Sequence, residues 1–120
     1  MPVRLKRVYE APAKDDGMRI LVDRLWPRGI AKEKTKIDLW LKEIAPSDTL
    51  RKRFHAKPEK WDTFLEAYFA ELGAETAAEA AKQLRRHLRK GSVTLLYAAK
   101  DEEHNNAVAL KAWLARKRRT

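Results

Sequence analysis

The stretch Ile20-Leu21-Val22-Asp23-Arg24-Leu25-Trp26-Pro27-Arg28-Gly29 joins a short apolar run to a charged and aromatic corner. Its first three residues are aliphatic, which predicts a strand buried on both faces, as in a parallel sheet covered by helices. Pro27 and Gly29 break the strand pattern. Because ligands of open α/β sheets bind at the carboxyl ends of the strands, the polar residues that follow Val22 are the first candidates for a site.

The composition bounds the class of protein. The chain has 120 residues, no cysteine and a formal net charge of +10, from 27 Lys and Arg against 17 Asp and Glu. This length predicts one domain, residues 1–120, with its own hydrophobic core. The lack of cysteine excludes disulfides, thiolate nucleophiles and Cys-based metal sites. No apolar run approaches the roughly 18 residues of a membrane span and no signal peptide is evident, so we expect a cytoplasmic protein without a membrane partner.

Two further segments have strand patterns. Residues 3–9 alternate apolar and basic side chains, and residues 92–98 are apolar almost throughout. The strand within the opening stretch is expected over residues 18–25. Asp16-Gly17, just before it, favours a hairpin with the first strand, whereas its continuous apolar centre favours a parallel sheet. We favour the parallel arrangement.

Helical periodicity predicts about five helices. The first, over residues 36–45, carries Ile37, Trp40, Leu41 and Ile44 at the spacing i, i+3, i+4, i+7. The others are expected over residues 47–57, 58–72, 74–90 and 102–117, with Ser47 and Asp101 as N-caps of the second and the last. The predicted fold is a single three-layer α/β domain, with a small, mostly parallel sheet of about three strands and a short basic tail at residues 116–120.

Two polar clusters meet at one sheet edge if these strands are parallel and adjacent. Arg24, Arg28 and Lys100 would then bind a small anionic ligand, a phosphate or a carboxylate, beside the N-terminus of the last helix. Asp23 and His104 are the candidates for proton transfer, and whether the site catalyses a reaction stays open. The remaining candidates shape the pocket or reach into it from the neighbouring helix: Trp26, Ser47, Arg51, Tyr97, Asn105 and Asn106.

Each of these residues also has a purely structural interpretation. Asp23 and Arg24 could pair with each other or with helix ends, and His104 could be a solvated helix residue. Trp26 fits a core residue that fixes the corner better than a stacking platform. Asn105 and Asn106 are poor helix formers, so their place near a helix start indicates polar contacts.

Nucleic-acid binding is the alternative function, because a net charge of this size attracts polyanions. It would use one basic helix face and the tail, through phosphate contacts that carry no sequence information. These residues are Lys82, Arg85, Arg86, Arg89, Arg116, Lys117, Arg118 and Arg119.

Familiar cofactor motifs are missing from the sequence. It contains no G-x-G-x-x-G, Walker A or G-x-S-x-G pattern, and its three histidines lack the spacing of metal ligands. We therefore expect no cofactor and no metal, and the oligomeric state stays open.

The segments 22–29 and 96–106 resemble those of the YeaO-like family of bacterial proteins, which has no established activity. The similarity covers nearly the whole chain and includes Asp38-Leu39-Trp40 and Ala45-Pro46-Ser47. Longer members of the wider superfamily carry Cys-His-Arg at the start of the last helix. The resemblance implies a parallel three-layer α/β fold with both strand ends at one pocket. This chain has Asn105-Asn106-Ala107 in place of Cys-His-Arg, which excludes thiol chemistry here.

Overall fold

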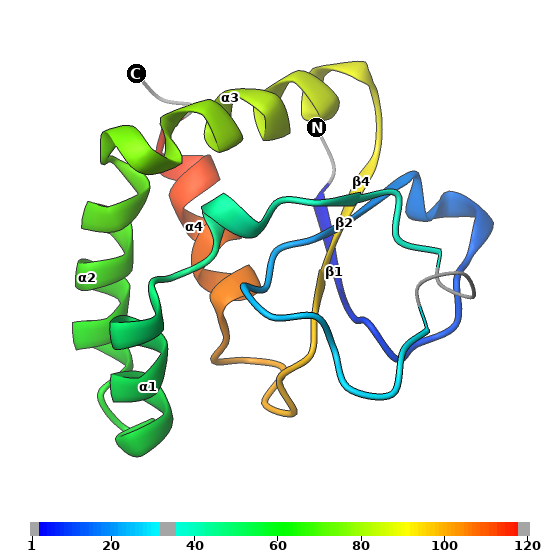
Figure 1. Ribbon diagram of the computed structural model, residues 1–120. Coiled ribbons are helices and arrows are strands. Elements are labelled where there is room, and N and C mark those ends of the chain that lie inside the picture. The colour runs from blue at the N-terminus through cyan, green and yellow to red at the C-terminus, as the bar shows by residue number, and fades with distance from the viewer. Residues whose placement is uncertain (1–2, 32–35, 118–120) are drawn as a thin grey trace.

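The computed structural model describes residues 3–31 and 36–117, and its elements confirm the α/β class (Figure 1). The strands in these ranges are β1 (Val3–Arg7), β2 (Met18–Leu21), β3 (Leu39–Trp40) and β4 (Val93–Tyr97). The α-helices there are α1 (Asp48–Ala56), α2 (Trp61–Leu72), α3 (Glu75–Lys90) and α4 (Asn106–Lys117), with 3-10 turns η1 (Lys14–Asp16) and η3 (Lys42–Ile44). No helix in the described ranges combines the length and the apolar character needed to cross a membrane.

The strands of the described residues form one parallel sheet in the order β1-β4-β2-β3. The hairpin suggested by Asp16-Gly17 does not form, because β4 lies between β1 and β2. Gly17 instead brings the loop against the start of β4: it has φ +66°, and a Cβ placed there would lie 2.2 Å from the Ser92 carbonyl oxygen. Only glycine fits this approach, which lets Met18 begin its pairing with Val93.

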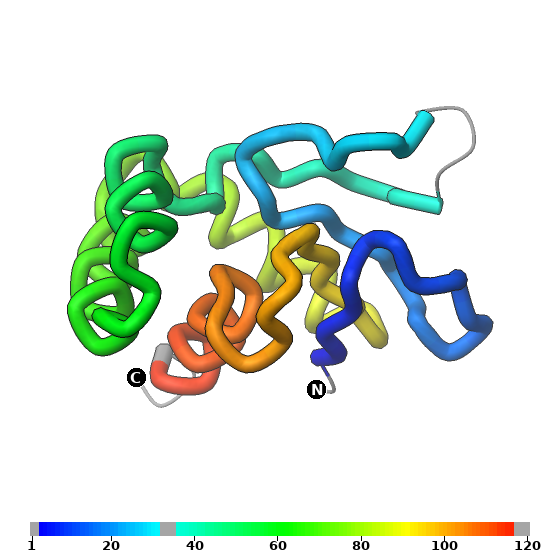
Figure 2. The backbone as a smooth tube through the Cα atoms, turned by 90° about the horizontal axis from the view of Figure 1, so that it is seen from below, coloured from blue at the N-terminus to red at the C-terminus, as the bar shows by residue number. Residues whose placement is uncertain are grey.

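The two faces of the sheet are covered differently, and the three expected layers are therefore unequal. One face carries Ile20 and Leu95 and packs against the helices through residues that include Tyr68, Leu84 and Leu110. The other face carries Leu21 and Leu96 and is covered by the connecting chain through Trp26, Ile30, Ile37 and Trp40. Figure 2 shows α1, α2 and α4 on one side of the strands and the cyan connection between β2 and β3 on the other.

The helix predicted over residues 36–45 is wrong. Its apolar residues do not share one face, because Ile37 and Trp40 pack under one side of the sheet and Ile44 under the other. Asp38 joins the sheet edge: its backbone N–H donates to the Arg19 carbonyl and its carboxylate accepts the Arg19 N–H, both at 2.8 Å. A two-residue strand and a single 3-10 turn therefore replace the helix.

Two boundaries also differ from the sequence prediction. The second strand ends at Leu21, earlier than residue 25. The last helix begins at Asn106, and its N-cap is Asn105, whose Oδ1 accepts the N–H of Val108 at 3.0 Å. Asp101, the predicted cap, closes its own turn by accepting the N–H groups of Glu103 and His104. Both predicted and actual caps are short polar side chains, so residue type alone could not choose between them.

A buried ion cluster lies on the face opposite the helices. The Asp16 carboxylate, 1% exposed, accepts bonds from Arg19 Nη1 at 2.5 Å, Lys6 Nζ at 3.1 Å and the Ala13 N–H at 3.0 Å. Burial alone raises the pKa of Asp16, but these hydrogen bonds and charges outweigh it and lower the pKa to about 2. The cluster also holds the β1–β2 connection to β4, because Thr94 Oγ1 donates to the Asp16 carbonyl at 2.7 Å.

Replacing Gly17 by alanine should destabilise the fold by about 2 kcal/mol or more, because the new Cβ meets the Ser92 carbonyl at a positive φ. Gly91 is the control: its backbone is extended and a Cβ there meets nothing within 4 Å. Urea unfolding of Gly17→Ala, Gly91→Ala and the wild type measures the free energy of unfolding of each. Equal stability of the two variants would contradict the close approach.

Asp16→Asn should cost about 3 kcal/mol at pH 7, since it leaves the buried Arg19 guanidinium without its carboxylate. Its neighbour Asp15 pairs with Arg4 on the surface, so Asp15→Asn should change stability by less than about 1 kcal/mol. Because the pKa of Asp16 falls from 3.8 to about 2 on folding, its stabilisation is complete above pH 3.8. Urea titrations should show the wild-type advantage over Asp16→Asn shrinking as the pH falls towards 2.

Candidate functional site

The exits of β2 and β4 are tied together at the carboxyl edge of the sheet. Asp23 Oδ2 accepts the Ala98 N–H at 2.9 Å, which joins the residue after β4 to the loop after β2. Asn106 Nδ2 donates to the Val22 carbonyl at 2.9 Å and to Asp23 Oδ1 at 3.0 Å. The first residue of α4 is thereby fixed to both, so both polar clusters open at the same edge.

Arg7, at the end of β1, also holds the segment that follows β4. Its Nε donates to the Ala99 carbonyl at 2.9 Å and its Nη2 to the Ala98 carbonyl at 3.0 Å. Sequence reasoning missed this residue, although Arg7 breaks the alternation by occupying a position on the apolar side of the strand. Its position at the carboxyl end of that strand was the signal that could have found it.

Asp23 is embedded in this network. Burial raises the pKa of the Asp23 carboxyl group, while the hydrogen bonds from Asn106 and the Ala98 N–H and the charge of Arg51 oppose the shift. Each carboxylate oxygen already accepts a hydrogen bond. Asp23 is thus a structural acceptor first, which matches the sequence alternative of pairing with a helix end.

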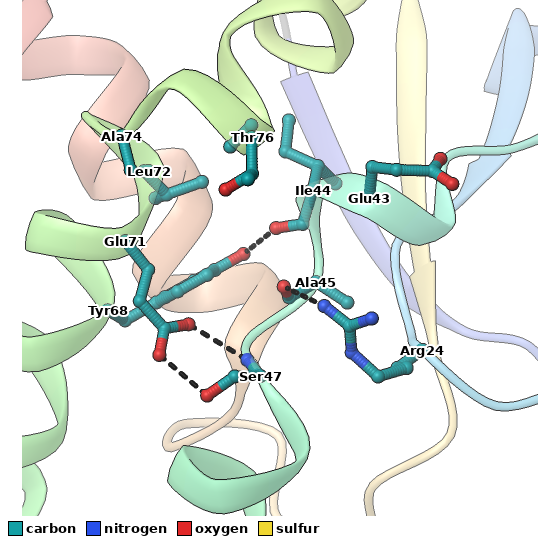
Figure 3. Close-up of a pocket in the computed structure, with 11 residues that line it drawn as sticks. Arg24, Glu43, Ile44, Ala45, Ser47, Tyr68, Glu71, Leu72, Ala74 and Thr76 are labelled. Atoms are coloured by element: carbon teal, nitrogen blue, oxygen red, sulfur yellow. Dashed lines mark hydrogen bonds between the residues drawn. The ribbon is translucent and has the colours of Figure 1, made fainter.

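Arg24 also bonds to the backbone. Its Nε donates to the Pro46 carbonyl at 2.9 Å and its Nη2 to the Ala45 carbonyl at 3.2 Å, which fixes the connection between η3 and α1. In Figure 3 its guanidinium lies beside Ala45, and both residues line a cavity of about 240 Å³. Part of its hydrogen-bonding capacity is therefore used before any ligand binds.

Ser47 lies in this smaller cavity. Its Oγ accepts the Leu50 N–H at 3.2 Å, which confirms it as the N-cap of α1, and donates to Glu71 Oε2 at 2.6 Å. Glu71 Oε1 also accepts the Ser47 N–H at 2.8 Å, and the buried Tyr68 hydroxyl donates to the Ile44 carbonyl at 2.7 Å (Figure 3). These bonds join α2 to the start of α1, so Ser47 has a structural role.

A larger cavity, of about 550 Å³, opens at the carboxyl edge itself. Most of the predicted site residues line it, from the loop after β2, from α1 and from the segment between β4 and α4. They are Asp23, Arg24, Trp26, Arg28, Arg51, Lys100, His104, Asn105 and Asn106. Ser47 and the buried Tyr97 do not. The cavity also has lining residues that the sequence did not single out, among them Tyr9, Phe54, His55 and Phe64.

The cavity lining is rich in cations. Arg24, Arg28, Arg51 and Lys100 contribute positive charge, and Asp23 is the one carboxylate among the lining residues. Within the described ranges the Arg28 and Lys100 side chains form no hydrogen bond or ion pair. This excess of positive charge suits an anionic ligand.

Arg51 has a donor that the described part of the chain leaves unsatisfied. Its Nε is buried and makes no hydrogen bond there, while its Nη2 lies 3.3 Å from the exposed Asp48 carboxylate. A buried donor without an acceptor is costly, and such atoms are rare in native proteins. Phe54 and His55 follow on the same face of α1, and this i, i+3, i+4 spacing was the sequence signal that could have added them to the site.

The other predicted residues show mixed roles. Trp26 Nε1 donates to the Ile30 carbonyl at 2.6 Å and its ring meets Trp40 edge-on at 5.4 Å, in line with a residue that fixes the corner. His104 is exposed; its Nδ1 lies 3.2 Å from Asp101 Oδ2, and its ring packs edge-on against Trp61 at 5.2 Å.

The cations proposed for nucleic-acid binding are partly engaged in the fold. Arg85 lies over the Trp113 ring at 5.1 Å, Arg116 lies over Phe69 at 5.1 Å, and Arg86 Nη2 is 3.5 Å from Glu79. Lys82 and Arg89 are exposed. Arg118, Arg119 and the side chain of Lys117 lie outside the description of the structure, so this alternative stays a prediction. No group of three or more His, Asp or Glu side chains in residues 3–31 and 36–117 could hold a metal ion.

The protein is of the α/β class, with a parallel sheet and a cation-lined cavity at the carboxyl edge of that sheet. The family model described as the "Inactive DUF488-N3 subclade" matches residues 2–120, and the chain belongs to this family. The chain is 46% identical over 114 residues to the uncharacterized protein YeaO of Escherichia coli K12. This alignment covers 95% of the chain and 97% of that relative. These findings confirm the resemblance to the YeaO-like family.

Relatives also occur outside Escherichia coli. The chain is 41% identical over 108 residues to the uncharacterized protein Rv3073c of Mycobacterium tuberculosis, with 90% of this chain and 89% of that relative covered. No solved structure matches the chain.

The carboxyl groups should titrate in a distinctive order. Burial raises the pKa of Asp23 above 3.8, whereas hydrogen bonds and charges lower the pKa of Asp16 to about 2. Because folding favours the protonated form of Asp23, its contribution to stability should decrease as the pH rises above 3.8. Carbon-13 NMR of the carboxyl groups, assigned with Asp23→Asn, measures both midpoints. A midpoint for Asp23 at or below 3.8 would contradict its burial.

Proposed function

We propose that the carboxyl-edge cavity binds a small organic or inorganic anion through a phosphate or carboxylate group. The observation that carries this proposal is the excess of cations in the cavity lining, where the Arg28 and Lys100 side chains form no hydrogen bond or ion pair with the described residues. The Arg51 side chain, 28% exposed, adds a guanidinium that an anionic oxygen can reach, and a charge-assisted bond of this kind is about twice as strong as a neutral one.

The local electrostatics support the same proposal. The oxygens of Asp23, the carboxylate in the cavity lining, accept hydrogen bonds from Asn106 and the Ala98 N–H. The lining thus holds four cationic side chains, Arg24, Arg28, Arg51 and Lys100, against this one carboxylate. Like charges gathered in a hollow concentrate the field there, and a bound anion would relieve their repulsion.

We infer a binding protein rather than a catalyst. Asp23, one of the two candidates for proton transfer, holds the loop after β4, and the subclade to which the chain belongs is described as inactive. The chain also contains no cysteine, which excludes a thiolate nucleophile. Arg28, Arg51 and Lys100 would hold the anion, while Arg24 and Asn106 fix the backbone around it.

Arg51→Gln should weaken the binding of phenyl phosphate by about tenfold or more, because it removes one of the cations that line the cavity. Arg53, exposed on the same helix and outside the cavity, provides the matched control with the same change of charge. Isothermal titration calorimetry of the wild type, Arg51→Gln and Arg53→Gln measures the affinities. Benzyl alcohol serves as the neutral probe.

Arg53→Gln should bind phenyl phosphate within about twofold of the wild type, since a distant exposed charge is screened by salt. Two results would overturn the proposed function: an equal loss of affinity in both variants, or binding of benzyl alcohol as tight as that of phenyl phosphate.

A further inference from the structure

The exposed large apolar side chains of the described chain gather at the candidate site. They are Tyr9, 47% exposed, and Leu25, 57% exposed, and both line the carboxyl-edge cavity. Tyr9 comes from the loop after β1 and Leu25 from the loop after β2, so the fold brings them together from distant parts of the chain. Single exposed apolar residues are ordinary, but their convergence on one cationic cavity needs a reason.

The Tyr9 ring is held in its exposed position. Its hydroxyl donates to the Arg28 carbonyl at 3.0 Å, and the Arg7 guanidinium lies 5.0 Å from the ring centre. Arg7 is fixed in turn by the carbonyls of Ala98 and Ala99. The ring is therefore preorganised, which reduces the entropy cost of any ligand contact that it makes.

The interior of the cavity is also apolar in part. Phe54 of α1 and Phe64 of α2 line it, with ring centroids 4.5 Å apart and planes tilted by 30°. Pro27 and Pro46 contribute further apolar lining. The cavity volume of about 550 Å³ lies within the range of sites that hold drug-sized molecules and far exceeds a bare phosphate or acetate ion.

From these observations we propose that the ligand is an organic anion that carries an aromatic ring or a comparable flat apolar group. The inference rests on the proposed function and adds the ligand class to it. The anionic group binds at Arg51 and the neighbouring cations, and the apolar group covers Leu25 and Tyr9. A bare anion would leave these apolar side chains in contact with water and gain nothing from them.

The test compares two phosphate monoesters of the same charge, phenyl phosphate and methyl phosphate, by calorimetry at constant salt. The wild type should bind phenyl phosphate about tenfold or more tightly, because the ring covers apolar surface that the methyl group cannot reach. Leu25→Ser should reduce this preference to about threefold or less, whereas Leu25→Met should retain it. Leu25 is exposed, so neither substitution threatens the core.

The outcomes separate this inference from the proposed function. Equal affinity for both esters, lost in Arg51→Gln, would overturn the aromatic ligand and leave the anion site standing. A preference for phenyl phosphate that is unchanged in Leu25→Ser would also overturn the assigned contact. Failure of both esters to bind would overturn the proposed function itself.

Discussion

The hydrogen bonds of the Asp23 carboxylate are the constraint on which the functional edge of this protein depends. One oxygen takes the N–H of Ala98 and the other the side-chain amide of Asn106, so a single carboxylate joins the exits of two strands to the start of the last helix. Asn106 extends the link to the Val22 carbonyl. These bonds hold the two loops and the helix start together at one edge, and so help to fix the arrangement of the cations that the loops carry.

The positive charge of the chain is divided between structural and exposed roles. Arg7 and Arg24 bind backbone carbonyls, and Arg19 binds the buried Asp16. The side chains of Arg28 and Lys100, by contrast, line the large cavity without hydrogen bonds or ion pairs to the described residues. The net charge of +10 is therefore a poor guide to function by itself. A cation can bind a ligand only where its donors are still available, and the fold decides this even between close neighbours in sequence. Arg24 donates to backbone carbonyls, whereas the Arg28 side chain forms no bond with the described residues.

Hydrophobic periodicity predicted the secondary structure correctly where a helix buries all its apolar residues in one core. It gave a wrong helix where the chain passes from one face of the sheet to the other. The stripes of α2 and α3 point into one core, and their helices were predicted closely. Residues 36–45 carry an equally good helical pattern. Their apolar side chains nevertheless divide between the two faces of the sheet, because the segment forms an edge strand on the way from one face to the other. A spacing pattern records which residues are buried and not which core buries them.

The sequence by itself determined the α/β class, the preference for parallel strands and the two polar clusters at the strand ends. These follow from local properties: apolar strand centres, helical spacing, and the rule that the ends of parallel strands share an edge. Only the tertiary structure decided that Ser47 belongs to another cavity, that Arg24 holds backbone carbonyls, and that Tyr9 and Leu25 meet at one opening. The physical reason is that these contacts join residues far apart in the chain, whose relative positions exist only once the sheet has assembled.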